Sequence, residues 1–379
     1  MLRCTRRLGD LGQPLFVITA CALGLTAASC KTNPRMLRVI PEDARLLYLG
    51  AFDRQEPQQP RFAWPATEVR FRFRGSAVSV ELTDTPYEDE TRETNFISVQ
   101  VDDAPPSTIA LREGKVRYPL AHNLAPGSHT LRLIKRTEAE VGTITLHDFT
   151  LSAGAEIETI ARPQRRILFV GDSITAGYGN EGPNERCPYS PSSSDATRTF
   201  ASLAARELGA EGLLHAWSGK GVSRNYEARD EGTMPELFMR VLPGDVGSPE
   251  IAASQPPDAV VIALGTNDFF RGTPDEQTFL LAYRSMLNRL ARYAPRAPTL
   301  FVLSPMLADD HPQPQARSTL RRWLERLAAE RARSQAKAEV LEQWVDPAEG
   351  LGCDYHPNVR TQTRLARELS TALRALAGW

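Results

Sequence analysis

The sequence has few cysteines, and no long run of charge of one sign follows its N-terminus. Three of its five cysteines lie within the first 30 residues, which leaves Cys187 and Cys353 in the rest of the chain. The formal net charge is only −1 in 379 residues. Nothing therefore indicates a nucleic acid or an anionic membrane surface as partner, and a ligand with little or no charge is favoured.

Metal-ligand spacing is also absent. Four of the six histidines are scattered along the chain without such spacing: His122, His129, His147 and His311. His215 lies inside an apolar strand and is expected to pack in a core. We therefore predict no metal and no cofactor.

The long apolar run of the sequence lies in residues 1–30. A basic start, "MLRCTRR", precedes "PLFVITACALGLTAASC", as in a signal peptide, so export to the periplasm, cell envelope or medium is expected. The run ends at Cys30, which resembles the lipidated cysteine of bacterial lipoproteins, although Ala27 stands where that motif prefers Leu. Cys21 fits the local pattern too, but cleavage there would halve the apolar run. We expect a lipid anchor at Cys30 as the protein's one link to a membrane.

The two remaining cysteines have two interpretations. Two cysteines that remain in an exported chain often pair in an oxidising compartment, so we favour a disulfide between Cys187 and Cys353. The alternative is two separate buried thiols.

Residues 38–150 show the period of β-strands. In "EVRFRF" the apolar Val69, Phe71 and Phe73 alternate with charged residues, and "AVSVEL" repeats the pattern. Further short strands are expected at "FISVQV", "HTLRLIKRT" and "GTITLHDFTL", separated by turn signals. This half predicts a β-sandwich or jelly roll, with residues 151–164 as a connector.

Residues 165–379 alternate between strands and helices. Near-continuous apolar runs at "ILFV", "LLHAW", "AVVIAL", "TLFVLS" and "AEVLEQW" are typical of parallel strands covered on both faces. Between and after them lie helical patterns, one of which opens with a capping box at Thr273, Pro274 and Glu276. This half predicts a doubly wound α/β domain.

Residues that carry chemistry follow three of these strands. "ILFV" is followed by "GDSI", "LLHAW" by "SGKG" and "AVVIAL" by "GTND", while "GCDYHPN" precedes the last helix. Ligands of such domains bind beyond the carboxyl ends of the strands. Each motif alone is more often a turn or a helix cap, but four of them in this order indicate a site.

The four motifs together supply the parts that acyl transfer needs. Ser173 is the candidate nucleophile and His356 its base, with Asp354 orienting the imidazole. If the segment is extended, side chains two residues apart point the same way. The backbone N–H groups of Ser173 and Gly219 and the amide of Asn267 are candidates for the oxyanion hole. Gly221 is an alternative to Gly219, whereas Asp172 is expected to cap a turn rather than act as a base.

The motifs resemble those of the SGNH (GDSL-like) hydrolase superfamily, whose blocks supply the Ser, Gly, Asn and His found here at 173, 219, 267 and 356. The acid at two rather than three residues before the histidine, together with the β-half, is similar to carbohydrate esterase family 2. The likeness extends over residues 45–375 and includes "HTLRLIKRTEAEVG", "GDSITAGYGNEG", "WSGKGVSRNY", "GTNDF" and "CDYHPN".

This resemblance implies a jelly roll fused to a hydrolase domain. It also implies removal of acetyl groups from plant polysaccharides such as xylan or glucomannan, with a leaning to the sugar 6-hydroxyl. Some members lack the acid and work with a Ser–His dyad, which is the alternative to a role for Asp354. If the loops of Cys187 and Cys353 meet at the site, their bond would stiffen the histidine loop.

Aromatic residues near these motifs are candidates for sugar contacts: Tyr226, Phe269 and Tyr355. Tyr355 should point away from its neighbours, and Trp217 is expected in the core. Two other functions stay open, a lipid, thioester or peptidoglycan O-acetyl hydrolase and a surface glycan-binding protein without activity. Polar, Gly-rich loops favour a short acyl group, and the presence of Ser, Gly, Asn and His argues for catalysis. We expect the β-half to have a structural role.

Overall fold

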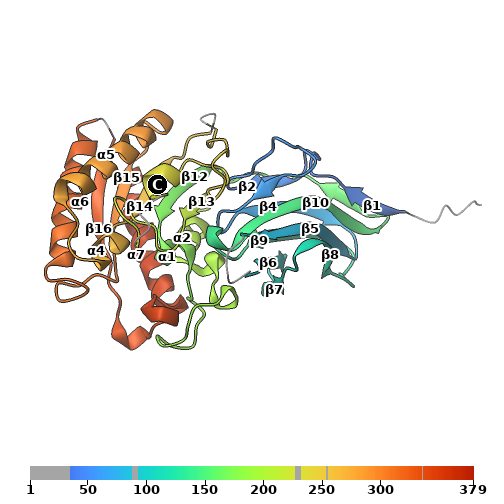
Figure 1. Ribbon diagram of the computed structural model, residues 1–379. Helices are drawn as coiled ribbons and strands as arrows, with labels where there is room; N and C mark the ends of the chain where they lie inside the picture. Colours follow the sequence, from blue (N-terminus) through green and yellow to red (C-terminus); the bar gives the residue numbers. More distant parts are fainter. Residues whose placement is uncertain (1–34, 88–92, 227–231, 253–254, 335) are drawn as a thin grey trace, which may run out of the picture. The chain divides into compact units, whose positions relative to one another are not determined.

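The computed structural model describes residues 35–87, 93–226, 232–252, 255–334 and 336–379 (Figure 1). These residues belong to one compact unit, Arg35–Trp379. The expected leader, with Cys21 and Cys30, lies outside the described residues. None of the helices described is long and apolar enough to cross a membrane.

The first half is an antiparallel sandwich of two sheets, as the sequence predicts. One sheet has the strand order β1–β10–β5–β8, with β3 paired to β10, and the other has the order β11–β4–β9–β6–β7, with β2 paired to β4. The strands are β1 (Met36–Val39), β2 (Leu47–Leu49), β3 (Arg61–Phe62), β4 (Glu68–Arg74), β5 (Val78–Pro86), β6 (Phe96–Val101), β7 (Ser107–Ala110), β8 (Gly114–Ala121), β9 (Ser128–Lys135), β10 (Gly142–Ala153) and β11 (Glu156–Glu158).

Alternation along the strands builds the core of the sandwich. The apolar face of β4 is fully buried, and Phe71 pairs in register with Leu131 of β9. Phe71 also meets Phe149 of β10 across the two sheets, with ring centroids 4.9 Å apart. The two sheets therefore pack through the side chains that the period-2 pattern places inward.

The boundary of the sandwich differs from the expected one. Strand β10 continues to Ala153, and β11 pairs with β4. Leu151 and Ile157 are buried in the sandwich core. The connector is therefore 159–164 rather than the expected 151–164. The sequence did not indicate β11, because a three-residue strand with one buried side chain carries too little pattern to be separated from a linker.

The second half is a parallel five-stranded α/β domain, which confirms the predicted fold class. The sheet has the order β13–β12–β14–β15–β16. Its strands are β12 (Arg165–Gly171), β13 (Ala210–Ala216), β14 (Ala259–Ala263), β15 (Thr299–Leu303) and β16 (Ala338–Glu342). Its helices are α1 (Ser173–Ala176), α2 (Phe200–Glu207), α3 (Met234–Leu237), α4 (Thr266–Phe270), α5 (Glu276–Tyr293), α6 (Ala316–Ala332) and α7 (Val359–Ala377). Short 3-10 helices lie at η1 (Ala139–Val141), η2 (Pro191–Ser193), η3 (Ala196–Arg198), η4 (Pro347–Glu349) and η5 (Cys353–Tyr355).

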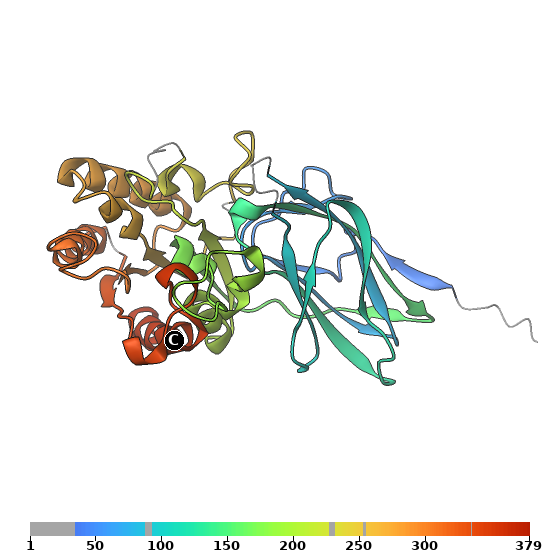
Figure 2. The same cartoon turned by 60° about the horizontal axis from the view of Figure 1, so that its bottom comes forward.

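Helices cover both faces of the parallel sheet (Figures 1 and 2). Successive residues of its strands pack against the helices of opposite faces. Ile167 and Phe169 of β12 pack with residues of α2 and α7. Leu168 and Val170 pack with residues of α5 and α6. Cover on both faces explains why these strands are apolar throughout rather than alternating.

One helix begins differently from the sequence expectation. The N-cap of α5 is Asp275, whose carboxylate accepts from the Thr278 N–H at 2.8 Å. The N-cap thus lies two residues after the expected Thr273, and the expected capping box of Thr273 and Glu276 does not form. Two capping residues close together are hard to rank from sequence, since both side chains are good N-caps.

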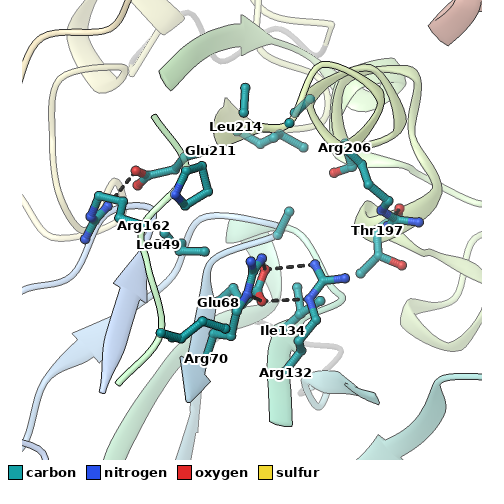
Figure 3. Close-up of a pocket in the computed structure, with 18 of the residues that line it drawn as sticks. Leu49, Glu68, Arg70, Arg132, Ile134, Arg162, Thr197, Arg206, Glu211 and Leu214 are labelled. Carbon is teal, nitrogen blue, oxygen red and sulfur yellow. Dashed lines mark hydrogen bonds and ion pairs between the residues drawn. The ribbon is translucent and has the colours of Figure 1, made fainter. Parts of the chain in front are cut away.

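The junction between the two halves contains a cavity of about 380 Å³, lined by ionic side chains (Figure 3). Glu68 of β4 binds Arg70 and Arg132, at 2.6 and 2.8 Å. Glu211, near the start of β13, binds Arg162 of the connector. The cavity thus lies at the amino end of β13, away from the strand ends that carry the sequence motifs.

Candidate active site

Ser173 lies directly after β12, as the first residue of α1. The preceding Asp172 caps this turn, because its carboxylate accepts from the Ile174 N–H at 3.1 Å. Burial raises the pKa of Asp172 to about 7. The Ser173 hydroxyl is largely buried but faces a cleft of about 480 Å³.

His356 contacts Ser173 from the loop that precedes α7. Its Nε2 is 2.8 Å from Ser173 Oγ, and its Nδ1 is 2.9 Å from the carbonyl oxygen of Asp354. A carbonyl only accepts, so Nδ1 carries the hydrogen and Nε2 is left to accept from the serine hydroxyl. Removal from water lowers the pKa of His356 to about 4, which keeps the imidazole neutral near pH 7.

The carboxylate of Asp354 does not contact His356, contrary to the sequence expectation. It accepts instead from the Tyr178 hydroxyl, at 2.8 Å. The expectation assumed an extended segment, but Asp354 and Tyr355 have φ values of +48° and +60°. This left-handed turn sends the carboxylate away from the imidazole and brings the Asp354 carbonyl to it.

Tyr178 supports the histidine in two ways. The centroid of its ring lies 4.4 Å from that of the His356 imidazole. The same ring stacks on Tyr189, with a distance of 4.2 Å between the ring centroids. Its hydroxyl holds Asp354, whose carbonyl binds Nδ1. Tyr178 was not predicted; its place in "GDSITAGYGN", five residues after Ser173, is the one signal in the sequence.

The histidine loop is attached to the loop that follows Ser173. Cys187 and Cys353 form a disulfide with their Cα atoms 4.7 Å apart, which is the pairing favoured from the sequence. The Cys353 N–H donates to the Gly179 carbonyl, and a Cβ on Gly182 would overlap the sulfur of Cys353. The base is thus held against the nucleophile's own loop by covalent and backbone bonds.

The two remaining motifs border the same cleft. Gly219 has a φ of +73°, which favours glycine, and it lines the cleft together with Asn267. The Asn267 amide also donates to the Lys220 carbonyl at 2.9 Å, which fixes its orientation. Gly221 does not line the cleft; its N–H donates to the Asn225 side chain.

Asp268 holds the loop that contains Gly219 through hydrogen bonds to its backbone. Its buried carboxylate accepts from the N–H groups of Val222, Ser223 and Arg224, at 2.7 to 3.2 Å. Burial raises the pKa of Asp268, and these hydrogen bonds oppose the rise. The motif "GTND" therefore supplies two functions, since Asn267 faces the cleft and Asp268 shapes the loop of Gly219.

The exposed aromatic residues of the cleft are Tyr226, Phe270 and Tyr355. Tyr226 and Phe270 form a ring pair with centroids 4.1 Å apart. Phe269, expected to contact substrate, is instead fully buried and packs on Trp323. Helix α4 is a single short turn, so the sequence did not indicate which of the two adjacent phenylalanines faces outward.

Within the described residues, no group of three or more His, Cys, Asp or Glu side chains is placed to hold a metal ion.

Two family models match the chain, and their boundaries follow the two halves of the fold. The carbohydrate esterase 2 N-terminal model matches residues 48–160, and the GDSL-like lipase/acylhydrolase model matches residues 169–364. The chain belongs to the GDSL-like hydrolases, in carbohydrate esterase family 2. This membership confirms the family and the enzyme class, an ester hydrolase, that the motifs indicate.

Two curated relatives and a solved structure each match nearly the whole chain. The cellulase/esterase CelE of Acetivibrio thermocellus is 29% identical over 88% of this chain, which spans 40% of that longer protein. An acetylxylan esterase/glucomannan deacetylase of Cellvibrio japonicus is 25% identical, covering 90% of this chain and 91% of its own length. A solved family-two esterase from Clostridium thermocellum, in complex with cellohexaose, has a TM-score of 0.82 at 29% identity, covering 88% of this chain and 99% of its own.

Proposed function

We propose that this chain is a serine esterase that removes acetyl groups from the hydroxyls of a polysaccharide. The observation that carries the proposal is the 2.8 Å contact between His356 Nε2 and Ser173 Oγ in a cleft. A neutral imidazole that accepts from a serine hydroxyl is the arrangement that activates serine toward a carbonyl carbon. Similarity to a deacetylase of xylan and glucomannan supports the choice of substrate class.

Acylation uses the groups already in contact. Ser173 Oγ attacks the acetyl carbonyl carbon while Nε2 of His356 takes the hydroxyl proton. The negative charge that develops on the carbonyl oxygen is stabilised by N–H groups of Ser173 and Gly219 and by the Asn267 amide. The Asp354 carbonyl holds the Nδ1 hydrogen of the imidazolium throughout.

The protonated histidine then completes the transfer. It passes the proton taken from Ser173 to the sugar oxygen as the bond from that oxygen to the acetyl carbon breaks, which leaves acetyl-Ser173. Nε2 then takes a proton from a water molecule, whose oxygen attacks the same carbon. Nε2 gives this proton to the Ser173 oxygen as the bond from that oxygen to the acetyl carbon breaks. Acetate leaves, and the dyad of Ser173 and His356 returns to its starting state.

The cleft fits a sugar ring beside a short acyl group. Sugar rings expose C–H faces that stack on aromatic rings, and the pair of Tyr226 and Phe270 offers such a face next to Asn267. Both rings are more than two-fifths exposed, and Tyr355 on the histidine loop is 60% exposed. We propose these three residues as sugar contacts.

Release of acetate from acetylated glucomannan and xylan tests this function. The protein without residues 1–30 should release acetate, and Ser173→Ala should lower the rate by about 10³-fold or more. Ser192→Ala, an exposed serine of the same domain, serves as the control and should keep the full rate. Equal rates for Ser173→Ala and the unmodified protein would overturn the assignment.

We also propose that the protein is exported and lipid-anchored at Cys30. The disulfide between Cys187 and Cys353 supports an oxidising compartment. Expression of the full chain in a Gram-negative host fed radiolabelled palmitate should label the protein. Cys30→Ser should abolish the label, whereas Cys21→Ser should retain it; the reverse pattern would place the anchor at Cys21, and an unlabelled full chain would refute the anchor.

A further inference from the structure

One segment of the sandwich reaches the loops of the active site. It is Lys135–Glu138, "KRTE", between the end of β9 and η1. It lies in the stretch "HTLRLIKRTEAEVG", which carries part of the family likeness and has no role in the chemistry derived above. Its four residues are all buried, although three of them have ionisable side chains.

Glu138 hydrogen-bonds the loop of the candidate oxyanion hole. Its carboxylate is 1% exposed, and Oε2 accepts from the Ser218 N–H at 2.8 Å. Ser218 immediately precedes Gly219, so this bond restricts the rotation of the peptide groups that orient the Gly219 N–H. The same loop is fixed on its far side by Asp268 through Val222 and Ser223.

A buried polar network fixes this end of the sandwich. Lys135 Nζ donates to the carbonyls of Thr137 and Glu138, at 2.9 and 2.6 Å. The Thr137 hydroxyl donates to Asn95 at 2.6 Å, and the Asn95 amide donates to Asp84 at 2.7 Å. Buried networks whose members are bonded to one another are rigid, so Glu138 is presented to the loop from a fixed backbone.

Arg136 attaches the same segment to the loop that follows the nucleophile. Its guanidinium donates to Asp195 at 2.9 Å and also pairs with Glu181. Its carbonyl accepts from the Ala196 N–H at 2.9 Å. Arg136 and Glu138, two positions apart in the sandwich, thus fix the loop after Ser173 and the loop of Gly219.

We propose that Glu138 is a positioning residue for the oxyanion hole, through which the β-sandwich sets the orientation of the Gly219 N–H. The inference rests on the proposed function, because it needs Gly219 to act as an oxyanion donor. It gives the sandwich a role in the rate of the reaction, distinct from binding the polysaccharide. An oxyanion donor acts mainly in the transition state, so its misplacement lowers kcat more than it raises KM.

Three substitutions at Glu138 test the proposal, with 4-nitrophenyl acetate as substrate. Glu138→Ala removes the acceptor, and Glu138→Asp withdraws it by one methylene while keeping a carboxyl group. We expect both to lower kcat by about 10- to 100-fold with KM within about twofold, less than loss of a whole donor costs. Glu138→Gln keeps an oxygen at the same reach and should restore kcat to within about threefold of the unmodified protein.

Asp148→Asn is the matched control. Asp148 is also a buried sandwich carboxylate, but it binds Arg38 and Arg117 on β1 and β8. Its substitution should lower the melting temperature and leave kcat unchanged. If Glu138→Ala fails to fold, Glu138→Asp and Glu138→Gln still decide the question.

An unchanged kcat in Glu138→Asp, or an equal loss of kcat in Glu138→Asp and Glu138→Gln, would overturn the proposal. Ser173→Ala is measured in the same series. If that variant keeps its activity, the proposed function itself fails. If it is inactive while the Glu138 variants match the unmodified protein, only the role of Glu138 fails.

Discussion

The two loops that bring the dyad together are held in different ways. Ser173 follows a buried strand, and its position comes from the register of β12 with β13 and β14 and from the Asp172 cap. His356 follows no strand directly; a disulfide, two left-handed residues and the Tyr178 ring hold it. The nucleophile is thus placed by the sheet, whereas the base is placed by its contacts with the nucleophile's loop.

Because several contacts hold His356, we expect loss of the imidazole itself to lower the rate far more than loss of any one of those contacts. His356→Ala removes the proton acceptor and should lower kcat/KM by about 10³- to 10⁴-fold. His122→Ala, an exposed histidine of the sandwich, is the control. Hydrolysis of 4-nitrophenyl acetate measures both, and a loss below about tenfold for His356→Ala would show that another group is the base.

The pH dependence should follow the lowered pKa of His356. Because burial brings this pKa to about 4, the imidazole is neutral and able to accept a proton above pH 4. We expect kcat/KM to be level from about pH 5 to 8 and to fall about tenfold for each pH unit below 4. Circular dichroism at each pH separates titration from unfolding, and a midpoint near 6.5 would contradict the buried environment.

Removal of the disulfide should weaken the histidine loop and spare the serine loop. Cys187→Ser combined with Cys353→Ser should lower the free energy of unfolding by about 2–5 kcal/mol. The displaced base should lower kcat/KM by roughly tenfold. Reducing agent should reproduce both effects, because the chain has no further cysteine beyond residue 30; an unchanged kcat/KM after complete reduction would show that the backbone bonds suffice.

The smallest effect is expected at Tyr178. Tyr178→Phe keeps the ring over His356 and removes only the hydrogen bond to Asp354. A bond of about 1 kcal/mol corresponds to a loss in kcat of about threefold to fivefold. Tyr118→Phe, which removes a hydroxyl that accepts from the Arg112 N–H in the sandwich, is the control. A loss of a hundredfold would place Tyr178 in the chemistry itself.

The sequence predicted the residues that the sheet places better than those that loop contacts place. Strand periods located Ser173, Gly219 and Asn267 at strand ends, because parallel strands bring their carboxyl ends together. The Asp354 contact was wrong because the period-2 rule holds only for extended backbone, and no signal in "GCDYHPN" announced two left-handed residues. Phe269 was wrong because one short turn of helix has no period to follow.

Contacts between the sandwich and the α/β domain also could not be predicted from the sequence. No role for Glu138 was predicted from the sequence, yet its carboxylate is buried against Ser218. Such a contact depends on how the sandwich meets the α/β domain, which local periodicity does not encode. The boundary of the connector was wrong for a different reason: pairing with β4 inside the sandwich defines β11, and a strand of three residues carries too little pattern to be recognised.

The most direct test of this account is the kcat/KM of Asp354→Asn. Asparagine adopts the left-handed conformation that position 354 requires and keeps an oxygen for Tyr178, so only the negative charge is lost. Because His356 is oriented by the carbonyl of residue 354, we predict kcat/KM within about tenfold of the unmodified protein. A loss of about 10⁴-fold, as expected where a carboxylate orients the catalytic histidine, would contradict the account.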